Sequence, residues 1–171
     1  TLLWYTTPTG GVGSTTAISP STATVGSFSA YVSQKNSAGC ESIRSIVTYN
    51  VNPSPSSPSV SSPVNYCQNQ TATSLVATAS GSNTLRWYTV PTGGTFTTIP
   101  FTPTTTSLGT TIYYVSQFTG FCESVRVPIV VNVNPVPLAA SSISGSTTVC
   151  SASQVTYTTT AITNATGYRW T

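Results

Sequence analysis

The sequence predicts an all-β protein made of tandem β-sandwich domains. Three observations predict this class: a composition rich in hydroxyl side chains, an internal repeat of 83 residues, and short runs with strand-like alternation. The 171 residues include 34 threonines and 27 serines, whereas charged residues make up 4% and hydrophobic residues 38%. Threonine is β-branched and favours a pleated surface, and a chain with this hydrophobic fraction can build cores.

The internal repeat runs through the whole sequence. LLWYTTPTGG at 2–11 returns as LRWYTVPTGG at 85–94, and the three tryptophans lie 83 residues apart. After a deletion of one residue, CESIR and NVNP return as CESVR and NVNP at a spacing of 82 residues. Self-similarity at a fixed period is the signature of a tandem array. We therefore expect the sequence to be a segment of a longer array.

The domain boundaries follow from this register. We expect the C-terminal part of one repeat at 1–54, a complete repeat at 55–135, and the N-terminal part of a further repeat at 136–171. The proline-rich segments NPSPSSP and NPVPLAAS lie at the two boundaries. Segments of this kind act as semi-rigid linkers.

The complete repeat contains strand signals at 73–79, 85–90 and 111–117. Its last strand alternates most clearly: Val125, Val127, Ile129, Val131 and Val133 are expected on one face, and Arg126, Asn132 and Asn134 on the other. About seven short strands in roughly 80 residues, with a tryptophan on the third, predict tandem immunoglobulin-like β-sandwich domains. The predicted core tryptophans are Trp4, Trp87 and Trp170.

The four cysteines allow three pairings, and the repeat selects one of them. Cys67 lies near the N-terminal end of the complete repeat and is its front cysteine, and Cys122 lies near the C-terminal end and is its back cysteine. We therefore predict a disulfide between them. Cys40 and Cys150 are then expected to pair with cysteines of repeats outside this sequence. A disulfide indicates an oxidising, extracellular setting.

Both acidic residues of the chain lie in the motif CESxR. Glu41 precedes Arg44, and Glu123 precedes Arg126, by three residues. This spacing places the two side chains on opposite faces of an ideal strand, so a local pair requires a bulge or a turn. One interpretation is a structural pair beside the disulfide of each repeat. The alternative is that Glu123 contacts the neighbouring repeat and sets the angle between repeats.

Tyr5 and Tyr88 each follow a predicted core tryptophan and are expected to face the other way. They are candidate surface-contact residues. One interpretation is an aromatic strip that stacks on a sugar, and the other is an ordinary exposed tyrosine on a sheet.

The composition argues against an active site. The chain has no histidine and no aspartate, and Glu41 and Glu123 occupy equivalent corners of different repeats, too far apart for paired-carboxylate chemistry. No cofactor or metal site is predicted, because CxxC motifs and clustered carboxylates are absent from the sequence. Without an apolar run of about 18 residues or a basic cluster, neither membrane insertion nor nucleic-acid binding is expected.

Several motifs resemble those of a known family. WYT.PTGG, YYVSQ, CES.R and VNVNP are similar to the immunoglobulin-like repeats of very large surface proteins of Bacteroidota, including SprB-like gliding-motility adhesins exported by the type IX secretion system. ISGSTTVCSASQVTYTTT resembles the PKD-like repeats of the same proteins.

The resemblance implies a non-catalytic stalk or spacer segment of a long, secreted cell-surface adhesin or gliding-motility filament. The expected partners are neighbouring repeats of the same chain, surface polysaccharide, and other cell-surface or secretion proteins. The alternative is a carbohydrate-binding or spacer module of a secreted polysaccharide-degrading enzyme.

Overall fold

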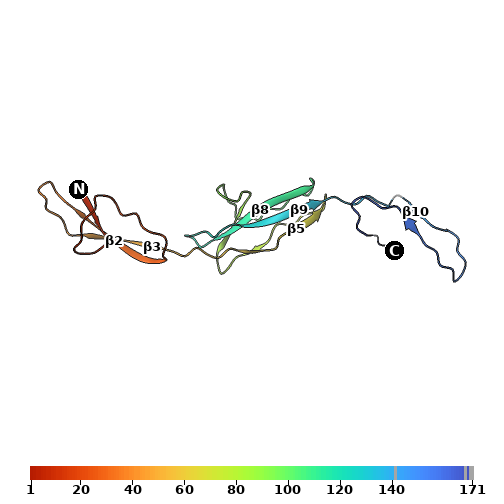
Figure 1. The fold of residues 1–171 in the computed structure, drawn as a ribbon, viewed down its shortest axis with the longest axis horizontal. Helices are drawn as coiled ribbons and strands as arrows, with labels where there is room; N and C mark the ends of the chain where they lie inside the picture. The colour runs from red at the N-terminus through yellow and green to blue at the C-terminus, as the bar shows by residue number, and fades with distance from the viewer. Residues whose placement is uncertain (141, 168, 170–171) are drawn as a thin grey trace. The chain divides into compact units, whose positions relative to one another are not determined.

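The computed structural model describes residues 1–140, 142–167 and 169 (Figure 1). Every regular element in this part of the chain is a strand, so it contains no helix that could cross a membrane. The strands are β1 (Leu2–Tyr5), β2 (Gly26–Gln34), β3 (Ser45–Val51), β4 (Ser59–Val60), β5 (Val64–Cys67), β6 (Ala77–Thr78), β7 (Thr84–Tyr88), β8 (Gly109–Phe118), β9 (Val127–Asn134), β10 (Ile143–Ser144) and β11 (Thr158–Thr159).

The chain divides into two compact units. The first consists of Thr1–Ser56 together with Phe118–Ser124, and the second of Ser57–Gln117 together with Val125–Thr171. The corner Phe118–Ser124 therefore groups with the first unit, although in sequence it belongs to the complete repeat at 55–135.

The first unit contains a three-stranded antiparallel sheet in the order β1-β2-β3. Trp4 lies opposite Val32, and Phe28 lies opposite Tyr49 with the two rings stacked at 5.6 Å between centroids. The backbone of Trp4 also exchanges two hydrogen bonds with Ser14, of 2.8 and 3.0 Å. These bonds hold the PTGG turn against the edge of the sheet.

The second unit contains a four-stranded sheet in the order β5-β9-β8-β7, and β5, β8 and β9 are labelled side by side in Figure 1. β8 and β9 are antiparallel, whereas β5 and β9 are parallel, with register from Val64 opposite Val131 to Cys67 opposite Asn134. The first full strand of the sheet thus runs beside the last one, in the same direction.

The core of the second unit lies between this sheet and the two-stranded sheet β4-β6. It is formed by Tyr66, Leu75, Trp87, Val115, Ile129 and Val131. Val60 of β4 and Ala77 of β6 pack against it, which closes the second layer. The predicted all-β sandwich is confirmed.

Strand β9 follows the alternation expected from the sequence. Ile129 and Val131 are 0% and 1% exposed, while Pro128 and Asn134 face solvent. Val125 departs from the prediction, because it precedes the strand and is 79% exposed. The predicted strand at 73–79 is also shorter than expected, since Leu75 donates its N–H to Phe101 in a loop instead of to a strand.

The repeat in the sequence is matched by a repeat in local structure. Trp87 exchanges backbone hydrogen bonds of 2.8 and 3.0 Å with Thr97, the same bonds that Trp4 makes with Ser14. Between them, Gly93 and Gly94 have φ of 63° and 69°, a conformation that glycine adopts without steric cost.

A further strand pair lies in the segment 136–171. β10 and β11 are antiparallel, with Ile143 opposite Thr159, and Tyr157 donates its hydroxyl to the carbonyl of Ser146 at 2.9 Å.

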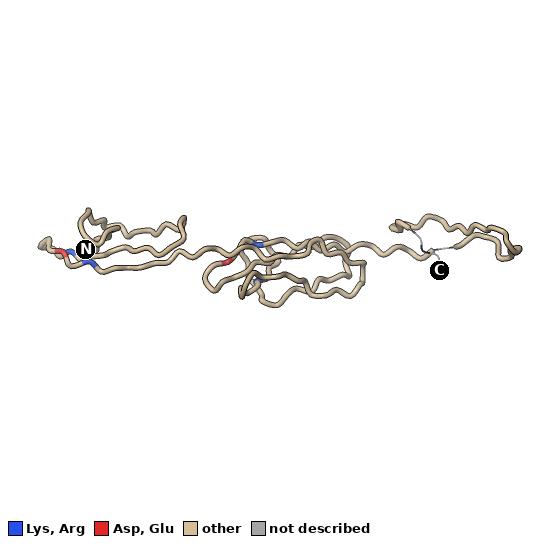
Figure 2. Tube along the Cα trace, turned by 90° about the horizontal axis from the view of Figure 1, so that it is seen from below, with Lys and Arg blue, Asp and Glu red and all other residues tan. Residues whose placement is uncertain are grey.

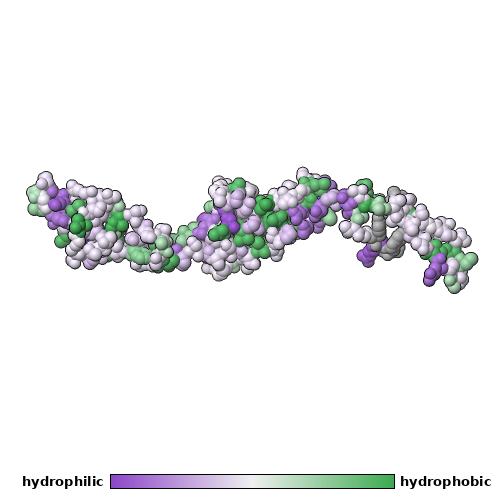
Figure 3. Space-filling view, viewed as in Figure 1, coloured by the Kyte–Doolittle hydropathy of each residue, from purple (hydrophilic) through white to green (hydrophobic). Residues whose placement is uncertain are grey.

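Charge is sparse along the whole described chain. Figure 2 shows only a few coloured segments on an otherwise tan tube, and Figure 3 shows that pale, weakly polar residues cover most of the visible face. Hydroxyl side chains therefore supply most of the surface polarity.

We expect Ile129→Ala to lower the free energy of unfolding by about 2–4 kcal/mol, because it removes a fully buried side chain and leaves a cavity. Ile112→Ala is the matched control: Ile112 lies on neighbouring β8 but is 41% exposed, so the loss should stay below about 1 kcal/mol. Urea denaturation followed by tryptophan fluorescence measures both. Equal losses would contradict the assignment of the core face.

Candidate functional site

The motif CESxR forms a corner between two long strands in each repeat. In the first repeat the chain leaves β2, turns at 36–40 and returns so that the backbone of Glu41 forms an isolated antiparallel β-bridge with that of Lys35. In the second repeat Glu123 bridges to Phe118 in the same way, after β8 and before β9. The arginine then lies just ahead of the final strand in both repeats.

Glu41 accepts hydrogen bonds from two buried hydroxyl groups. Tyr5 Oη and Ser33 Oγ each lie 2.5 Å from Glu41 Oε1. Tyr5 is 5% and Ser33 is 2% exposed, so neither hydroxyl has ready access to water. The carboxylate therefore satisfies polar groups that would be costly to bury alone.

Arg44 covers the face of the same tyrosine. Its guanidinium carbon lies 3.3 Å from the centre of the Tyr5 ring, and Nη1 donates a hydrogen bond of 2.8 Å to the carbonyl of Thr7. A planar guanidinium over an aromatic face combines cation–π attraction with stacking. We call this arrangement of glutamate, tyrosine and arginine the tyrosine clamp.

The second repeat contains the same stacking. The guanidinium carbon of Arg126 lies 3.2 Å from the centre of the Tyr88 ring, and Nη1 donates a bond of 2.8 Å to the carbonyl of Val90. Glu123 and Ser116 occupy the positions of Glu41 and Ser33, and both have interaction partners of their own.

The predicted acid–base pair therefore acts through a third residue in the first repeat. Glu41 binds the hydroxyl of Tyr5, and Arg44 binds its ring, so the two charges are joined through the tyrosine and not directly. The corner supplies the turn that the three-residue spacing required. The interpretation in which Glu123 contacts a neighbouring repeat stays a prediction.

The prediction that Tyr5 and Tyr88 face solvent is corrected by the structure. They are 5% and 3% exposed, because an arginine covers each ring. A buried ring cannot offer its face to a sugar. Trp87 is buried at 1%, Trp4 is half-buried, and Trp170 lies outside the described residues.

The predicted bond between Cys67 and Cys122 is absent from the structure. Both carry free thiols, as do Cys40 and Cys150. Cys67 lies opposite Asn134 at the end of β9, whereas Cys122 lies in the turn that precedes the start of β9. The two ends of β9 are more than 20 Å apart, since the strand has eight residues at about 3.3 Å each.

The sequence reasoning missed the hydroxyl and amide partners on the central strand. Ser33 and Ser116 belong to the repeated segment YVSQ, and Gln117 is fully buried. Gln117 Oε1 accepts from the Ser80 N–H, and Nε2 donates to Ser80 Oγ, both at 2.7 Å. The recurrence of the serine in YVSQ was the available signal for the hydroxyl partner, whereas Gln34, the counterpart of Gln117, is exposed, so the repeat gave no signal for the buried amide.

The environment of Glu41 lowers its pKa from the ordinary value of 4.5. The hydrogen bond from Ser33 is the largest cause and the bond from Tyr5 the next, and the charges of Arg44 and Lys35 add to them. Desolvation opposes the shift. Glu41 is therefore ionised at neutral pH and engaged by donors, which makes it a poor general base.

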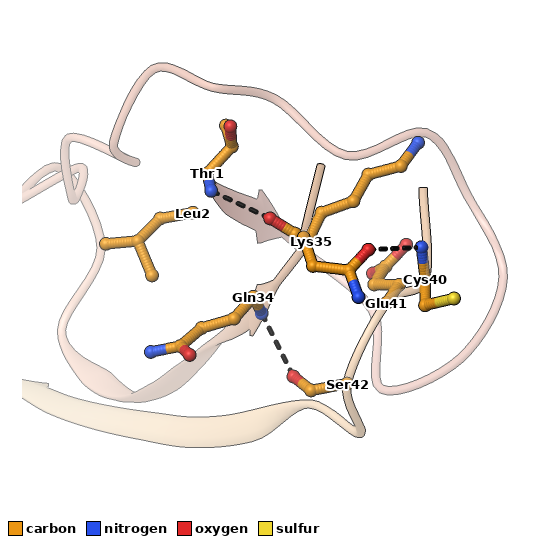
Figure 4. Close-up of a pocket in the computed structure, with 8 residues that line it drawn as sticks. Thr1, Leu2, Gln34, Lys35, Cys40, Glu41 and Ser42 are labelled. Atoms are coloured by element: carbon orange, nitrogen blue, oxygen red, sulfur yellow. Dashed lines mark hydrogen bonds between the residues drawn. The ribbon is translucent and has the colours of Figure 1, made fainter. Parts of the chain in front are cut away.

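A shallow depression lies beside the clamp of the first repeat (Figure 4). In it the Thr1 amino group donates to the Lys35 carbonyl at 2.8 Å, and Gln34 N–H donates to Ser42 Oγ at 3.0 Å. These contacts involve backbone groups and hold the corner in place. Among the described residues, no group of three or more His, Cys, Asp or Glu side chains could hold a metal ion.

Two segments match known family models. Residues 55–135 match the Ig-like domain described as CHU_C associated, and residues 136–171 match a PKD-like domain. The matches fit Ig-like repeats. Domains of these two kinds are typically non-catalytic and usually occur in extracellular proteins. A search of curated proteins finds no match to the chain.

We expect Arg126→Lys to destabilise the Ig-like repeat by about 1–2 kcal/mol, because lysine cannot stack flat on Tyr88 while it reaches the Val90 carbonyl. Arg169→Lys makes the same change at an exposed position and should have no measurable effect. Urea denaturation compares the two variants. Equal stability of both would show that charge alone, and not the planar group, holds the clamp.

Glu41 should titrate below 4.5 in the folded chain. Because its folded pKa is lowered, the stability it contributes is present above the unfolded value and is lost as pH falls through the folded value. The chain has only two glutamates, so 13C NMR of their carboxyl carbons follows each separately. Tyr5→Phe should move the pKa of Glu41 back toward 4.5, whereas Tyr31→Phe should not. An unchanged pKa in Tyr5→Phe would remove the tyrosine hydroxyl from the clamp.

Proposed function

We propose that the chain is a non-catalytic stalk or spacer segment of a long, secreted cell-surface adhesin or gliding-motility filament. The observation that carries the proposal is the tyrosine clamp, whose arginine stacking is present in both repeats. Arg44, Arg126 and Glu41 are engaged in holding tyrosines and backbone carbonyls inside the fold. Arginine and glutamate side chains often act in catalytic or binding sites, but in this chain they stabilise a repeated unit.

The strand arrangement suits a segment that bears tension. Ser57, two residues into the complete repeat, donates its hydroxyl to the carbonyl of Val125 at 3.2 Å, just ahead of β9. The chain leaves this repeat at Asn134, the other end of β9. Force along the chain would then run parallel to β5 and β9 and perpendicular to the hydrogen bonds between them. Such bonds must break together, so the pair resists extension.

The corrected position of Tyr5 and Tyr88 weighs against the sugar-binding alternative, because both rings are covered by arginine. The domain matches support an extracellular repeat. Export by type IX secretion, kinship with SprB-like motility adhesins, and contacts with surface polysaccharide or other surface proteins belong to the same proposal and rest on the resemblance of the sequence motifs.

Deleting residues 53–134 tests the spacer role in producing cells. The deletion joins Asn52 to Pro135 and so restores the junction Asn-Pro that ends each repeat. A spacer predicts that surface display and cell attachment are retained. Abolished attachment with normal display would mean that this repeat binds the target itself. A glycan array probed with the 171-residue chain gives an independent check: no saturable binding is expected, and saturable binding would favour the carbohydrate-binding module.

A further inference from the structure

Cys67 lies at the exit of the complete repeat. It ends β5 opposite Asn134, and the N–H of the following residue, Gln68, donates to the Asn134 carbonyl at 2.8 Å. Asn134 is the last residue of β9, immediately before the proline-rich linker. The front cysteine of a repeat is therefore found beside the point where the chain leaves that repeat.

Cys122 precedes β9 in the sequence and belongs to the compact unit formed with residues 1–56. Its Sγ lies 3.6 Å from the carbonyl oxygen of Asn52. Around it, Thr119 N–H and Oγ1 both bond to the Cys122 carbonyl, which fixes the turn that presents the thiol.

The repeat register connects these two observations. NVNP at 50–53 corresponds to NVNP at 132–135, so Asn52 is the counterpart of Asn134. The carbonyl that Cys122 approaches is therefore the equivalent of the carbonyl that Gln68 binds next to Cys67. In an array, a back cysteine and the front cysteine of the repeat before it would meet at one asparagine.

We propose that successive repeats are joined by a disulfide between the front cysteine of one repeat and the back cysteine of the next. Cys122 bonds to the counterpart of Cys67 one repeat earlier, and Cys67 bonds to the counterpart of Cys122 one repeat later. By the same rule Cys40 pairs with the front cysteine of the repeat before its own, and Cys150 pairs with the back cysteine of the repeat after its own. None of the four pairs with another of the four, in agreement with four free thiols in this chain.

The chemistry is a thiol–disulfide exchange. Each bond removes two protons and two electrons from a pair of thiols, and the disulfide of an oxidised dithiol carrier accepts them and becomes a dithiol. Cys67, Cys40 and Cys150 are exposed and Cys122 is half-buried, so such a carrier has access to them. An oxidising compartment maintains the product.

The bonds would change how the array carries load. Cys122 would be bonded to the preceding repeat and Cys150 to the following repeat. The covalent path from one of these bonds to the other then runs along only 28 residues of the chain. The residues between Cys67 and Cys122 lie inside closed loops and cannot be pulled out. The array would therefore keep its length even if a repeat unfolded. This inference rests on the repeat register and is independent of what the protein adheres to.

A fusion of the chain to itself provides the test. Because Trp4 and Trp170 lie two periods apart, residues 1–169 followed by 4–171 continue the array in register. Cys67 of the first copy should bond to Cys40 of the second, and Cys150 of the first copy to Cys122 of the second. Refolding with oxidised glutathione, blocking with N-ethylmaleimide and mass spectrometry of the peptides identify the bonds. Cys67→Ser in the first copy should remove the first bond and leave the second.

The unfused chain supplies a second measurement that needs no new junction. Asn52→Cys should bond to Cys122, since the carbonyl of Asn52 already lies beside its thiol. Asn134→Cys is the matched variant one repeat later and should bond to Cys67 and not to Cys122. A Cys67–Cys122 bond within one copy, or free thiols in a folded fusion together with no bond in Asn52→Cys, would overturn the proposal. Either result leaves the spacer role to be judged by the deletion of residues 53–134.

Discussion

The stacking of an arginine on a buried tyrosine is the interaction on which each repeat depends. The tyrosine ends the strand that carries the core tryptophan, and the arginine directly precedes the last strand. Holding the two together therefore fixes the strand that carries the tryptophan against the segment that leads into the last strand. In a chain with 4% charged residues, the positions of a few charged side chains decide the geometry of each repeat, because hydroxyl groups cannot replace a planar cation over a ring.

The parallel pairing of β5 with β9 determines where Cys67 lies. This pairing carries Cys67 to the end of β9, whereas Arg126 of the clamp lies immediately ahead of the start of that strand in the sequence. With the first strand parallel to the last, any residue at the end of the first strand lies near the exit of the repeat. The front cysteine is thus found at the exit of its repeat, while the back cysteine precedes the last strand in the sequence.

Much of this fold could be predicted from the sequence, and the reasons are specific. The alternation of β9 and the turn glycines are local patterns, so Ile129, Val131 and the PTGG turns were readable directly. The burial of Tyr5 and Tyr88 was not, because the residue that covers each ring lies 38 or 39 positions away and reaches it only after the corner forms. Alternation assigned those tyrosines to the outer face correctly but could not show that the outer face is covered there.

The disulfide prediction failed for a similar reason. Counting one front and one back cysteine per repeat suggests a closed unit, but it assumes that sequence order within a repeat reflects spatial order. The parallel β5–β9 pair breaks that assumption, since it places the front cysteine beside Asn134, the last residue of the last strand. What the sequence did contain was the repeat of NVNP at 50–53 and 132–135, which equates Asn52 with Asn134. Cys122 contacts Asn52, and Cys67 lies opposite the equivalent residue Asn134. In the proposed array the back cysteine of one repeat and the front cysteine of the repeat before it therefore lie at the same junction.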